Sequence, residues 1–306
     1  MRDSFIETLC NLMPKHPEIV LITGDLGFGV LNKYISLYPD NFINAGVAEQ
    51  NMTGIATGLA LEGRIVFTYS IANFPTLRCL EQIRNDSCYH NANVKIVAIG
   101  GGFSYGALGI SHHATEDLAI LRSLPEITIL SPTGNWETIE STKALINTPG
   151  TCYLRLDKSS ADDGPVDKNE VFEIGKSRQL KDGFDCTIFS TGGILEESLL
   201  AHEKLLNKGI SSRIISMHTI KPIDKESIIK ASKETELVVT VEEHTKYGGL
   251  GGAVAEVLLR SNTPPKKFLS IALEDGFSSV VGSQRYLRTF YKLDSDAIVD
   301  KIISII

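Results

Sequence analysis

The sequence has few cysteines and no long apolar segment. Among its 306 residues there are five cysteines and one tryptophan. No run reaches the roughly 18 consecutive apolar residues that a membrane-spanning helix needs. The cysteines are odd in number and none is spaced C-x-x-C, which favours reduced thiols over a disulfide framework. The amphipathic N-terminus also lacks the apolar core of a signal peptide. We therefore predict a soluble cytoplasmic chain with no membrane partner.

Positive charge is also in the minority. The chain has 30 Lys and Arg against 37 Asp and Glu, a net charge of -7. Such a chain has no overall attraction for a phosphate backbone, so we expect no nucleic-acid partner. Its length is that of two ordinary domains of ~150 residues each.

Short β-branched runs alternate with segments of helical periodicity, an order typical of parallel sheets covered by helices on both faces. In the first half the predicted strands are Ile19–Thr23, Phe42–Ala45, Ile65–Tyr69, Val94–Gly100, Ile127–Leu130 and Cys152–Leu156, and the predicted helices are Asp3–Met13, Glu49–Leu61, Pro75–His90, Glu116–Arg122 and Asn135–Ile146. In the second half the strands are Cys186–Thr191, Ser212–Ser216, Leu237–Glu242 and Phe268–Ala272, and the helices are Leu195–Asn207, Lys225–Lys233, Gly252–Arg260 and Asp294–Ile303.

One polar segment interrupts this alternation. Asp157–Asn169 contains Gly and Pro and has no periodicity, as is typical of a linker. We therefore predict two doubly wound α/β domains with mainly parallel sheets, over residues 1–165 and 166–306.

Two strand ends in the first half carry candidate ligand sites. Gly24–Gly29 reads GDLGFG, but its glycine order differs from that of a dinucleotide loop and no Walker lysine follows, which favours a simple turn. Glu49 opens a helix at the carboxyl end of a strand, where open α/β sheets bind ligands. By spacing alone, compensation of the helix dipole is the better explanation of Glu49.

Two further glycine-rich segments follow. Five glycines within Gly100–Gly109 indicate backbone close to a ligand or a mobile loop. The adjacent pair His112 and His113 is more typical of a hydrogen-bonded turn than of a metal centre, and we predict no metal site in this chain. The GGLGG run after His244 has the simpler interpretation of a flexible loop between a strand and a helix.

Together these segments resemble the thiamine-diphosphate-dependent transketolase family. The matching stretches are GDLGFG, FINAGVAEQNMTGIATGLALEG, FTYS, RCLEQIRND, SHHATEDLAILRSLP, TILSPT, MHTIKPID and VVTVEEHTKYGGLGGAVAEVL. They cover nearly the whole chain in the family's order. The resemblance implies a pyrimidine-binding domain of the thiamine-diphosphate-binding fold followed by a transketolase C-terminal-like domain. It also implies the C-terminal-half subunit of a split transketolase. An N-terminal-half partner would carry the Mg²⁺ site for the diphosphate, in an α2β2 assembly.

The resemblance implies roles for five residues. Glu49 matches the glutamate that hydrogen-bonds the cofactor's aminopyrimidine and so promotes deprotonation of the thiazolium carbon. Asp25 matches an aspartate near the cofactor. Phe74 matches the ring that stacks on the pyrimidine, with a core phenylalanine as the competing interpretation. His112 matches a histidine close to the reacting substrate. Arg155 matches an arginine for substrate phosphate, to which a guanidinium is suited.

One position departs from the family's pattern. Leu108 stands where many members have an acidic residue that contacts a hydroxyl of the donor sugar. Because leucine accepts no hydrogen bond, we expect a deoxy, branched or otherwise modified donor. The predicted reaction is transfer of a two-carbon ketol unit from a ketose phosphate to an aldose, with thiamine diphosphate shared with the partner subunit and Mg²⁺ bound mainly by that partner.

Two other enzyme types and one other class remain as alternatives. The enzymes are the β subunit of a 2-oxo acid dehydrogenase and a deoxyxylulose-phosphate-synthase-like condensing enzyme. Oxo-acid β subunits usually open their first loop with G-E-D-V-G, whereas this chain has GDLGFG. The other class is a non-catalytic α/β scaffold or nucleotide-binding subunit, against which the presence of Glu49 argues.

Overall fold

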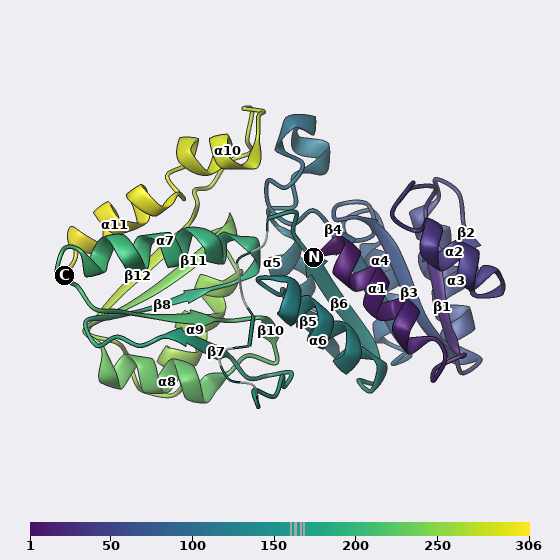
Figure 1. The fold of residues 1–306 in the computed structure, drawn as a ribbon, viewed down its shortest axis with the longest axis horizontal. Helices are drawn as coiled ribbons and strands as arrows, with labels where there is room; N and C mark the ends of the chain where they lie inside the picture. The colour runs from purple at the N-terminus through teal and green to yellow at the C-terminus, as the bar shows by residue number, and fades with distance from the viewer. Residues whose placement is uncertain (160, 162–163, 166, 168) are drawn as a thin grey trace.

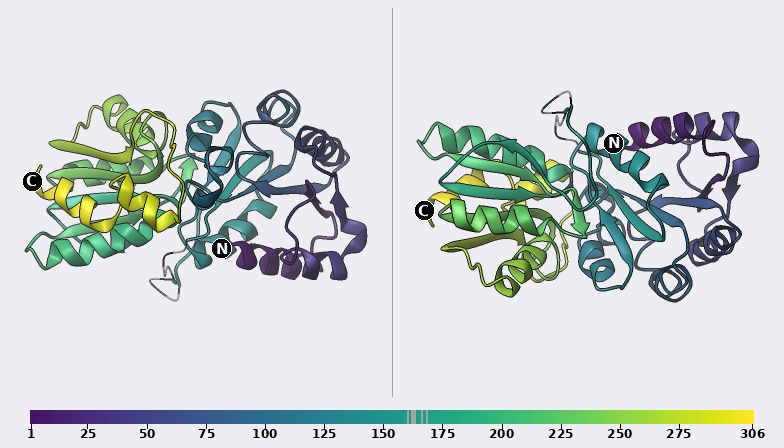
Figure 2. Two further views of the ribbon diagram at one scale, coloured as in Figure 1. Left: turned by 90° about the horizontal axis from the view of Figure 1, so that it is seen from above. Right: turned by 90° about the horizontal axis from the view of Figure 1, so that it is seen from below.

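The described residues fold around two sheets, one of seven strands and one of five. The computed structural model describes residues 1–159, 161, 164–165, 167 and 169–306. Helices cover both faces of each sheet, and the two layered units lie side by side (Figures 1 and 2). The predicted pair of α/β domains is thereby confirmed. The predicted linker over Asp157–Asn169 and the boundary between residues 165 and 166 lie partly outside the described residues, so the boundary stays a prediction.

The first sheet has the strand order β10-β5-β6-β4-β3-β1-β2. Its strands are β1 Ile19–Thr23, β2 Phe42–Asn44, β3 Ile65–Ile71, β4 Val94–Ile99, β5 Ile127–Leu130, β6 Thr151–Leu156 and β10 Thr219–Lys221. All neighbours pair in parallel except β10 and β5. The central strands are buried on both faces, as their continuous apolar runs predict.

The second sheet has the order β12-β11-β8-β9-β7. Its strands are β7 Arg178–Lys181, β8 Cys186–Ser190, β9 Ser212–Ser216, β11 Leu237–Thr245 and β12 Lys267–Leu273. Only the edge pair of β7 and β9 is antiparallel.

Helices connect these strands in the order expected for βαβ units. They are α1 Arg2–Leu12, α2 Asn32–Leu37, α3 Glu49–Leu61, α4 Leu80–Gln82, α5 Asp117–Arg122, α6 Asn135–Ile146, α7 Leu195–Leu206, α8 Lys225–Glu234, α9 Leu250–Arg260, α10 Gln284–Phe290 and α11 Ser295–Ile303. The side chain of Asp294 accepts a hydrogen bond from the Ala297 N–H and caps α11, as expected for aspartate before a helix. Among the described residues, no helix has both the length and the apolar character required to cross a bilayer.

Four elements were not predicted: β7, β10, α2 and α10. The strand β10 belongs by sequence to the second half of the chain, yet it pairs antiparallel with β5, Thr219 lying opposite Leu130. It therefore adds an edge strand from the second half to the first sheet. Its three residues are too few to show periodicity, and its place depends on β5, which is remote in sequence.

The single long helix predicted over Pro75–His90 is wrong. The structure has turns up to Cys79, the short helix α4, and then a π-helical turn over Ile83–Cys88. Hydrogen bonds of the π type widen a helix and displace its side chains. Here Ser87 meets Thr57 of α3 with 2.8 Å between their hydroxyl oxygens, a contact that periodicity alone does not reveal.

One hydrophobic core runs through both units. A single cluster of buried side chains includes Ile129 and Tyr153 from the first sheet together with Ile215 from the second sheet and Val254 from α9. The two units are therefore packed against each other rather than loosely joined.

Candidate functional site

Glu49 lies buried at the carboxyl edge of the first sheet. Strand β2 ends at Asn44, Gly46 turns the chain with a positive φ of 74°, and α3 begins at Glu49. Only 2% of the residue is exposed. One carboxylate oxygen, Oε2, accepts a hydrogen bond of 2.6 Å from Nη1 of Arg78. In the part of the chain that the structure describes, no hydrogen bond reaches the other oxygen, Oε1. The site therefore offers an open acceptor in a poorly solvated position.

Asn44 holds the loop of Asp25 beside this turn. The Asn44 side-chain oxygen accepts hydrogen bonds from the backbone N–H groups of Asp25 and Gly46, each 3.0 Å long, and its amide donates to Asp25 Oδ1 at 3.0 Å. Asp25 has a positive φ of 57°, which Asn and Asp tolerate better than most residues. The exposed Asp25 carboxylate is thus fixed next to the strand-to-helix turn that ends in Glu49. Sequence reasoning did not single out Asn44, the last residue of β2, as a site residue.

Phe74 and His112 extend the group around Glu49. The Arg78 guanidinium lies 5.0 Å above the Phe74 ring, and the rings of Phe74 and His112 meet edge-on with 5.2 Å between centroids. Glu49, Arg78, Phe74 and His112 therefore form one continuous chain of contacts. Phe74 is only half-buried, and a half-buried ring in contact with a cation and a histidine does not fit the competing interpretation as a core residue. Arg78, which sequence reasoning missed, covers both Glu49 and Phe74.

The loop that carries His112 presents both polar and apolar side chains. Ser111 Oγ lies 2.9 Å from His112 Nδ1. Burial, with a further contribution from His113, lowers the pKa of His112 below its ordinary value, so the ring is neutral near pH 7. On the same loop Leu108 and Ile110 are 56% and 47% exposed. An apolar surface therefore lies next to the histidine.

Arg155 is enclosed by other residues of the chain, whereas the resemblance implied that it meets substrate. It is 1% exposed, and its Nε donates a hydrogen bond of 2.9 Å to Asp117 Oδ2 while Nη1 lies 3.7 Å from Asp157 Oδ1. Burial alone would lower the pKa of Arg155, but these two carboxylates outweigh it and raise that pKa. A guanidinium enclosed by its own carboxylates has no free edge for a phosphate, so the geometry assigns Arg155 to the junction between the domains.

Lys158 places a cation against Tyr105 of the His112 loop. Its ammonium lies 3.8 Å from the centroid of the Tyr105 ring, and that ring is 6.2 Å from the His112 ring. Burial lowers the pKa of Lys158, and the nearby charge of Arg2 adds to the effect. The residue is exposed. Sequence reasoning missed it because it falls within the predicted linker.

The GGLGG segment is a capped helix start rather than a flexible loop. Glu242, within β11, accepts hydrogen bonds from the backbone N–H groups of Leu250 and Gly251, at 2.7 and 2.8 Å. A Cβ on Gly249 would lie 2.1 Å from Glu242 Oε2, so glycine permits this approach. The chain's own carboxylate thus occupies the position where a helix N-terminus would attract an anion.

Comparison with known proteins gives a consistent result over both domains. Residues 1–162 match the model of the transketolase pyrimidine-binding domain, and residues 175–298 match that of the transketolase C-terminal domain. The chain is 42% identical to a putative transketolase C-terminal section of Methanocaldococcus jannaschii, over 99% of this chain and 95% of that protein. It is 38% identical to one of the subunits of the apulose-4-phosphate transketolase of Phocaeicola vulgatus, over 97% and 94% of the two chains.

A further relative, named for another substrate, and a solved structure are also similar to this chain. The chain is 33% identical to the 6-deoxy-6-sulfo-D-fructose transketolase subunit of a Clostridium species, over 98% of this chain and 92% of that protein. A solved structure described as a split-gene transketolase, an inactive β4 tetramer, is 34% identical with a TM-score of 0.89, over 99% of this chain and 97% of that one. The chain therefore belongs to the transketolase family of thiamine-diphosphate-dependent transferases, of which it contains the pyrimidine-binding and C-terminal domains.

Proposed function

We propose that this chain is a subunit of a transketolase that transfers a two-carbon ketol unit from a ketose phosphate to an aldose, with Glu49 binding and activating the cofactor's pyrimidine. The observation that carries this proposal is the buried Glu49 carboxylate, whose Oε1 is open as an acceptor at the carboxyl edge of a parallel sheet. Ligands of open α/β folds bind at that edge.

The residues present fit an aminopyrimidine ring. Glu49 supplies a carboxylate acceptor in a site of low dielectric, where a hydrogen bond to a ring nitrogen is strong. Phe74 supplies a half-buried aromatic face, and Asp25 a fixed carboxylate nearby. Thiamine diphosphate, when bound, supplies the electron sink for the transfer of the two-carbon unit. The Arg78 side chain contacts both Glu49 and Phe74. Because 47% of this side chain is exposed, it can turn into solvent and make room for the pyrimidine ring.

His112 and Lys158 are proposed to meet the sugar substrate. A neutral His112 ring both donates and accepts hydrogen bonds at pH 7, which suits it to hold a substrate hydroxyl and to exchange a proton with it. Lys158 supplies a positive charge on the same side through its contact with Tyr105. We assign the phosphate of the substrate to Lys158 rather than to the enclosed Arg155.

A second type of polypeptide is part of the proposal. We propose an N-terminal-half subunit that holds the diphosphate through Mg²⁺, and an α2β2 complex in which thiamine diphosphate is shared between the subunits. The solved relative, described as a β4 tetramer, is also described as inactive, which supports a requirement for a partner of another kind. We further propose that the complex is cytoplasmic and that the domains of this chain cover residues 1–165 and 166–306.

The donor is proposed to be a modified sugar. Leu108 is exposed on the His112 loop, where it offers apolar contact and no side-chain acceptor for a hydroxyl. Two relatives are named for transketolases of apulose 4-phosphate and of 6-deoxy-6-sulfo-D-fructose, which supports a donor outside the ordinary pentose phosphates. A donor screen of the purified complex tests this point, and xylulose 5-phosphate as the best donor would contradict it.

Substitution of Glu49 tests the central assignment. In the complex reconstituted with its partner, Glu49→Ala should lower kcat by about 100-fold or more, as for loss of a central proton-transfer group. The matched control is Glu62→Ala, which removes an exposed glutamate at the other end of α3 and should leave kcat unchanged. Wild-type kcat in Glu49→Ala would overturn the catalytic role.

A further inference from the structure

The loop that carries His112 is closed at its base by two backbone hydrogen bonds. Gly102 and Ala114 each donate their N–H to the other's carbonyl, at 2.8 and 2.9 Å. Between them, Asn73 donates from its side chain to the carbonyl of His113. The first domain therefore holds the loop at His113, next to one end of this base.

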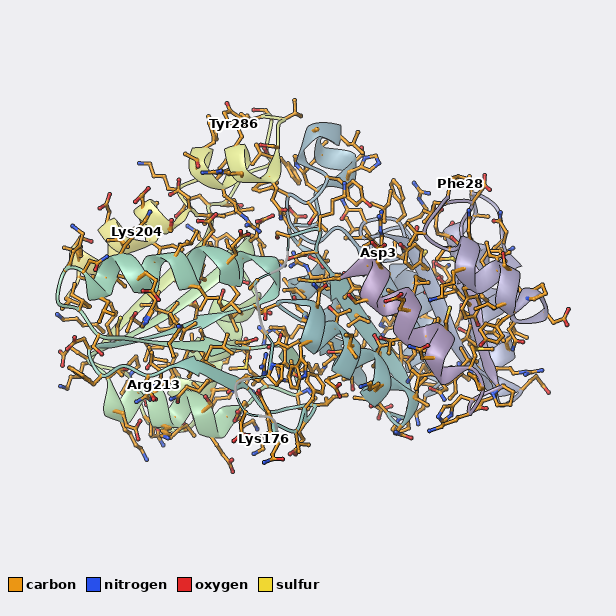
Figure 3. All side chains as sticks on the ribbon, viewed as in Figure 1. Asp3, Phe28, Lys176, Lys204, Arg213 and Tyr286 are labelled. Carbon is orange, nitrogen blue, oxygen red and sulfur yellow. The ribbon has the colours of Figure 1, made fainter. Side chains whose placement is uncertain are left out.

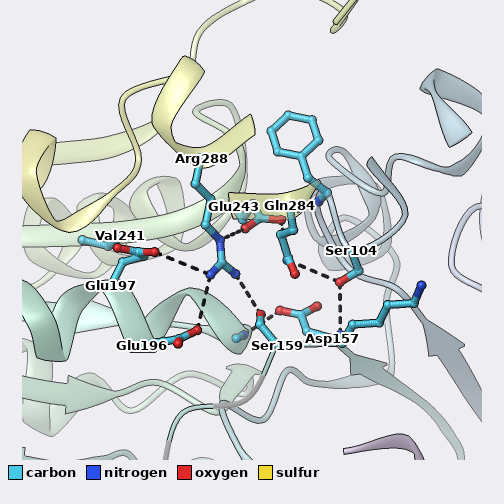
Figure 4. A network of polar contacts seen from close by, with 12 residues as sticks. Ser104, Asp157, Ser159, Glu196, Glu197, Val241, Glu243, Gln284 and Arg288 are labelled. Atoms are coloured by element: carbon cyan, nitrogen blue, oxygen red, sulfur yellow. Dashed lines mark hydrogen bonds and ion pairs between the residues drawn. The ribbon is translucent and has the colours of Figure 1, made fainter. Parts of the chain in front are cut away.

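Glu243 of the second domain holds the loop next to the other end of this base. The residue lies near the end of β11 and is 1% exposed. Its Oε1 accepts a hydrogen bond from the backbone N–H of Phe103 and a second one of 2.9 Å from Gln284 Nε2. Its Oε2 accepts from Nε of Arg288. Figure 4 shows this carboxylate between Arg288 and Gln284. A carboxylate from one domain thus binds the first residue inside the loop of the other.

Gly102 makes room for this approach. Its φ is +57°, and a Cβ at this position would lie 2.4 Å from Glu243 Oε1. Backbone conformation and close contact both require glycine here. One of the glycines before His112, Gly102, is therefore required for contact with the second domain.

Arg155 ties the other end of the base to the same residue. Its Nη2 donates to the carbonyl of Ala114 at 3.0 Å and to the backbone carbonyl of Glu243 at 3.2 Å. Glu243 thus holds residue 103 through its side chain, and residue 114 through its backbone and Arg155. Both ends of the loop are therefore connected by hydrogen bonds to the same residue of β11, Glu243.

Arg288, which binds the Glu243 carboxylate, is itself held in place by other side chains. Arg288 donates from Nη2 to Ser159 Oγ at 2.8 Å, and its Nη1 lies within 4.0 Å of Glu196 and Glu197 (Figure 4). Burial alone would lower the pKa of Arg288, but the adjacent Glu243 outweighs it and raises that pKa. Buried ion pairs of this kind contribute little net stability, and where they have a role it is to specify one conformation.

We infer that Glu243 is a positioning residue that fixes the His112 loop from the second domain. It touches neither substrate nor cofactor and acts through the Phe103 N–H and the loop base. This gives the C-terminal domain a part in a site to which the first domain supplies Glu49, Phe74 and His112. The kinetic consequence rests on the proposed function, whereas the ordering of the loop does not.

Amide hydrogen exchange of the purified chain tests the ordering directly. Glu243→Gln keeps the shape of the side chain but replaces the carboxylate with a neutral amide. The Arg288 guanidinium then loses its charged partner, and the Phe103 N–H loses its charged acceptor. Exchange over residues 101–114 should rise by at least about tenfold, because the hydrogen bond from the Phe103 N–H loses its charged acceptor and is weakened. The matched control is Glu242→Gln, the equally buried neighbour whose carboxylate caps α9 and, among the described residues, makes no hydrogen bond to the loop. It should leave exchange over 101–114 at the wild-type level.

A milder variant keeps the test decisive if Glu243→Gln folds poorly. Gln284→Ala removes the 2.9 Å bond to Glu243 without leaving a charge unpaired, and should raise exchange over the same residues by a smaller factor. Wild-type exchange over 101–114 in both Glu243→Gln and Gln284→Ala would overturn the inference.

Kinetics of the reconstituted complex separate positioning from general damage. Glu243→Gln should lower kcat by about tenfold while the concentration of thiamine diphosphate for half-maximal activity stays constant, because Glu49 and Phe74 are untouched. Equal changes in both parameters would indicate general damage and contradict the inference. If Glu49→Ala proved fully active while Glu243→Gln loosened the loop, the proposed function would fail and the positioning of the loop would stand.

Discussion

At the scale of residues, burial separates the groups that a ligand can reach from the groups that hold the molecule together. Glu49 and Arg155 are both charged and almost fully buried. Glu49 has an open oxygen and one half-exposed partner, whereas Arg155 is enclosed by Asp117 and Asp157. Residue type alone points to both as ligand-binding groups. Only the partners distinguish an accessible site from an internal ion pair.

Lys158 is predicted to bind the substrate's phosphate. Lys158→Met should raise KM for a phosphorylated sugar about tenfold, since a charge-assisted hydrogen bond is lost, and should leave KM for the unphosphorylated sugar unchanged. Steady-state kinetics of the complex with both sugars measure this. Lys143→Met is the matched control, because Lys143 pairs with Glu140 on the surface of α6. An equal rise in KM for the two sugars would argue against phosphate recognition.

At the scale of elements, the ends of strands decide what each glycine-rich segment does. The turn after β2 leaves a carboxylate oxygen open, whereas the GGLGG turn after β11 is closed by Glu242. Both follow a parallel strand and precede a helix, so their sequences look equally capable of binding an anion. The difference lies in whether a nearby acidic side chain already fills the helix N-terminus.

Removal of the α9 cap should destabilise the chain. Glu242→Ala leaves the N–H groups of Leu250 and Gly251 without their acceptor in a buried position. The expected loss is about 2 kcal/mol in the free energy of unfolding. Urea denaturation measures it, with the exposed Glu203→Ala on α7 as a control that should change stability by less than about 0.5 kcal/mol. A loss no larger than that of the control would contradict the capping role.

At the scale of the whole molecule, the two domains share one of their hydrophobic clusters and leave apolar side chains on their outer surfaces. The common hydrophobic core and the strand β10 join the units, and Glu243 and Arg155 add buried polar contacts. Phe28 and Tyr286 lie on the surfaces of the first and the second domain (Figure 3), 80% and 51% exposed. Because the common core, β10 and the buried polar contacts join the two domains, we expect the domains to unfold together in a single transition.

Acid should weaken this combined structure through His218. The ring is buried and stacked on Phe172 at 4.3 Å, and burial lowers its pKa below the ordinary 6.5. The unfolded chain then binds the proton more tightly than the folded one, so stability is complete above pH 6.5 and falls as the pH drops below it.

Chemical denaturation between about pH 7.5 and pH 5 measures this dependence. Each unit of pKa difference contributes at most about 1.4 kcal/mol. His218→Asn should flatten the dependence in that window, and an unchanged slope would show that another group is responsible. His202→Asn is a suitable control, since His202 is a buried histidine of the same domain, hydrogen-bonded to Ser212.

By itself, the sequence determined the two α/β domains, the strands that are buried on both faces, the family, and the candidate group of Glu49, Asp25, Phe74 and His112. These features depend on contiguous residues, whose periodicity and motifs can be recognised without knowing which distant residues they contact. The tertiary structure decided the rest: the edge strand β10, the enclosure of Arg155, the cover of Arg78 over Glu49, and the hold of Glu243 on Phe103, 140 positions away in the chain. Such contacts depend on which distant side chains meet, and no local pattern encodes that.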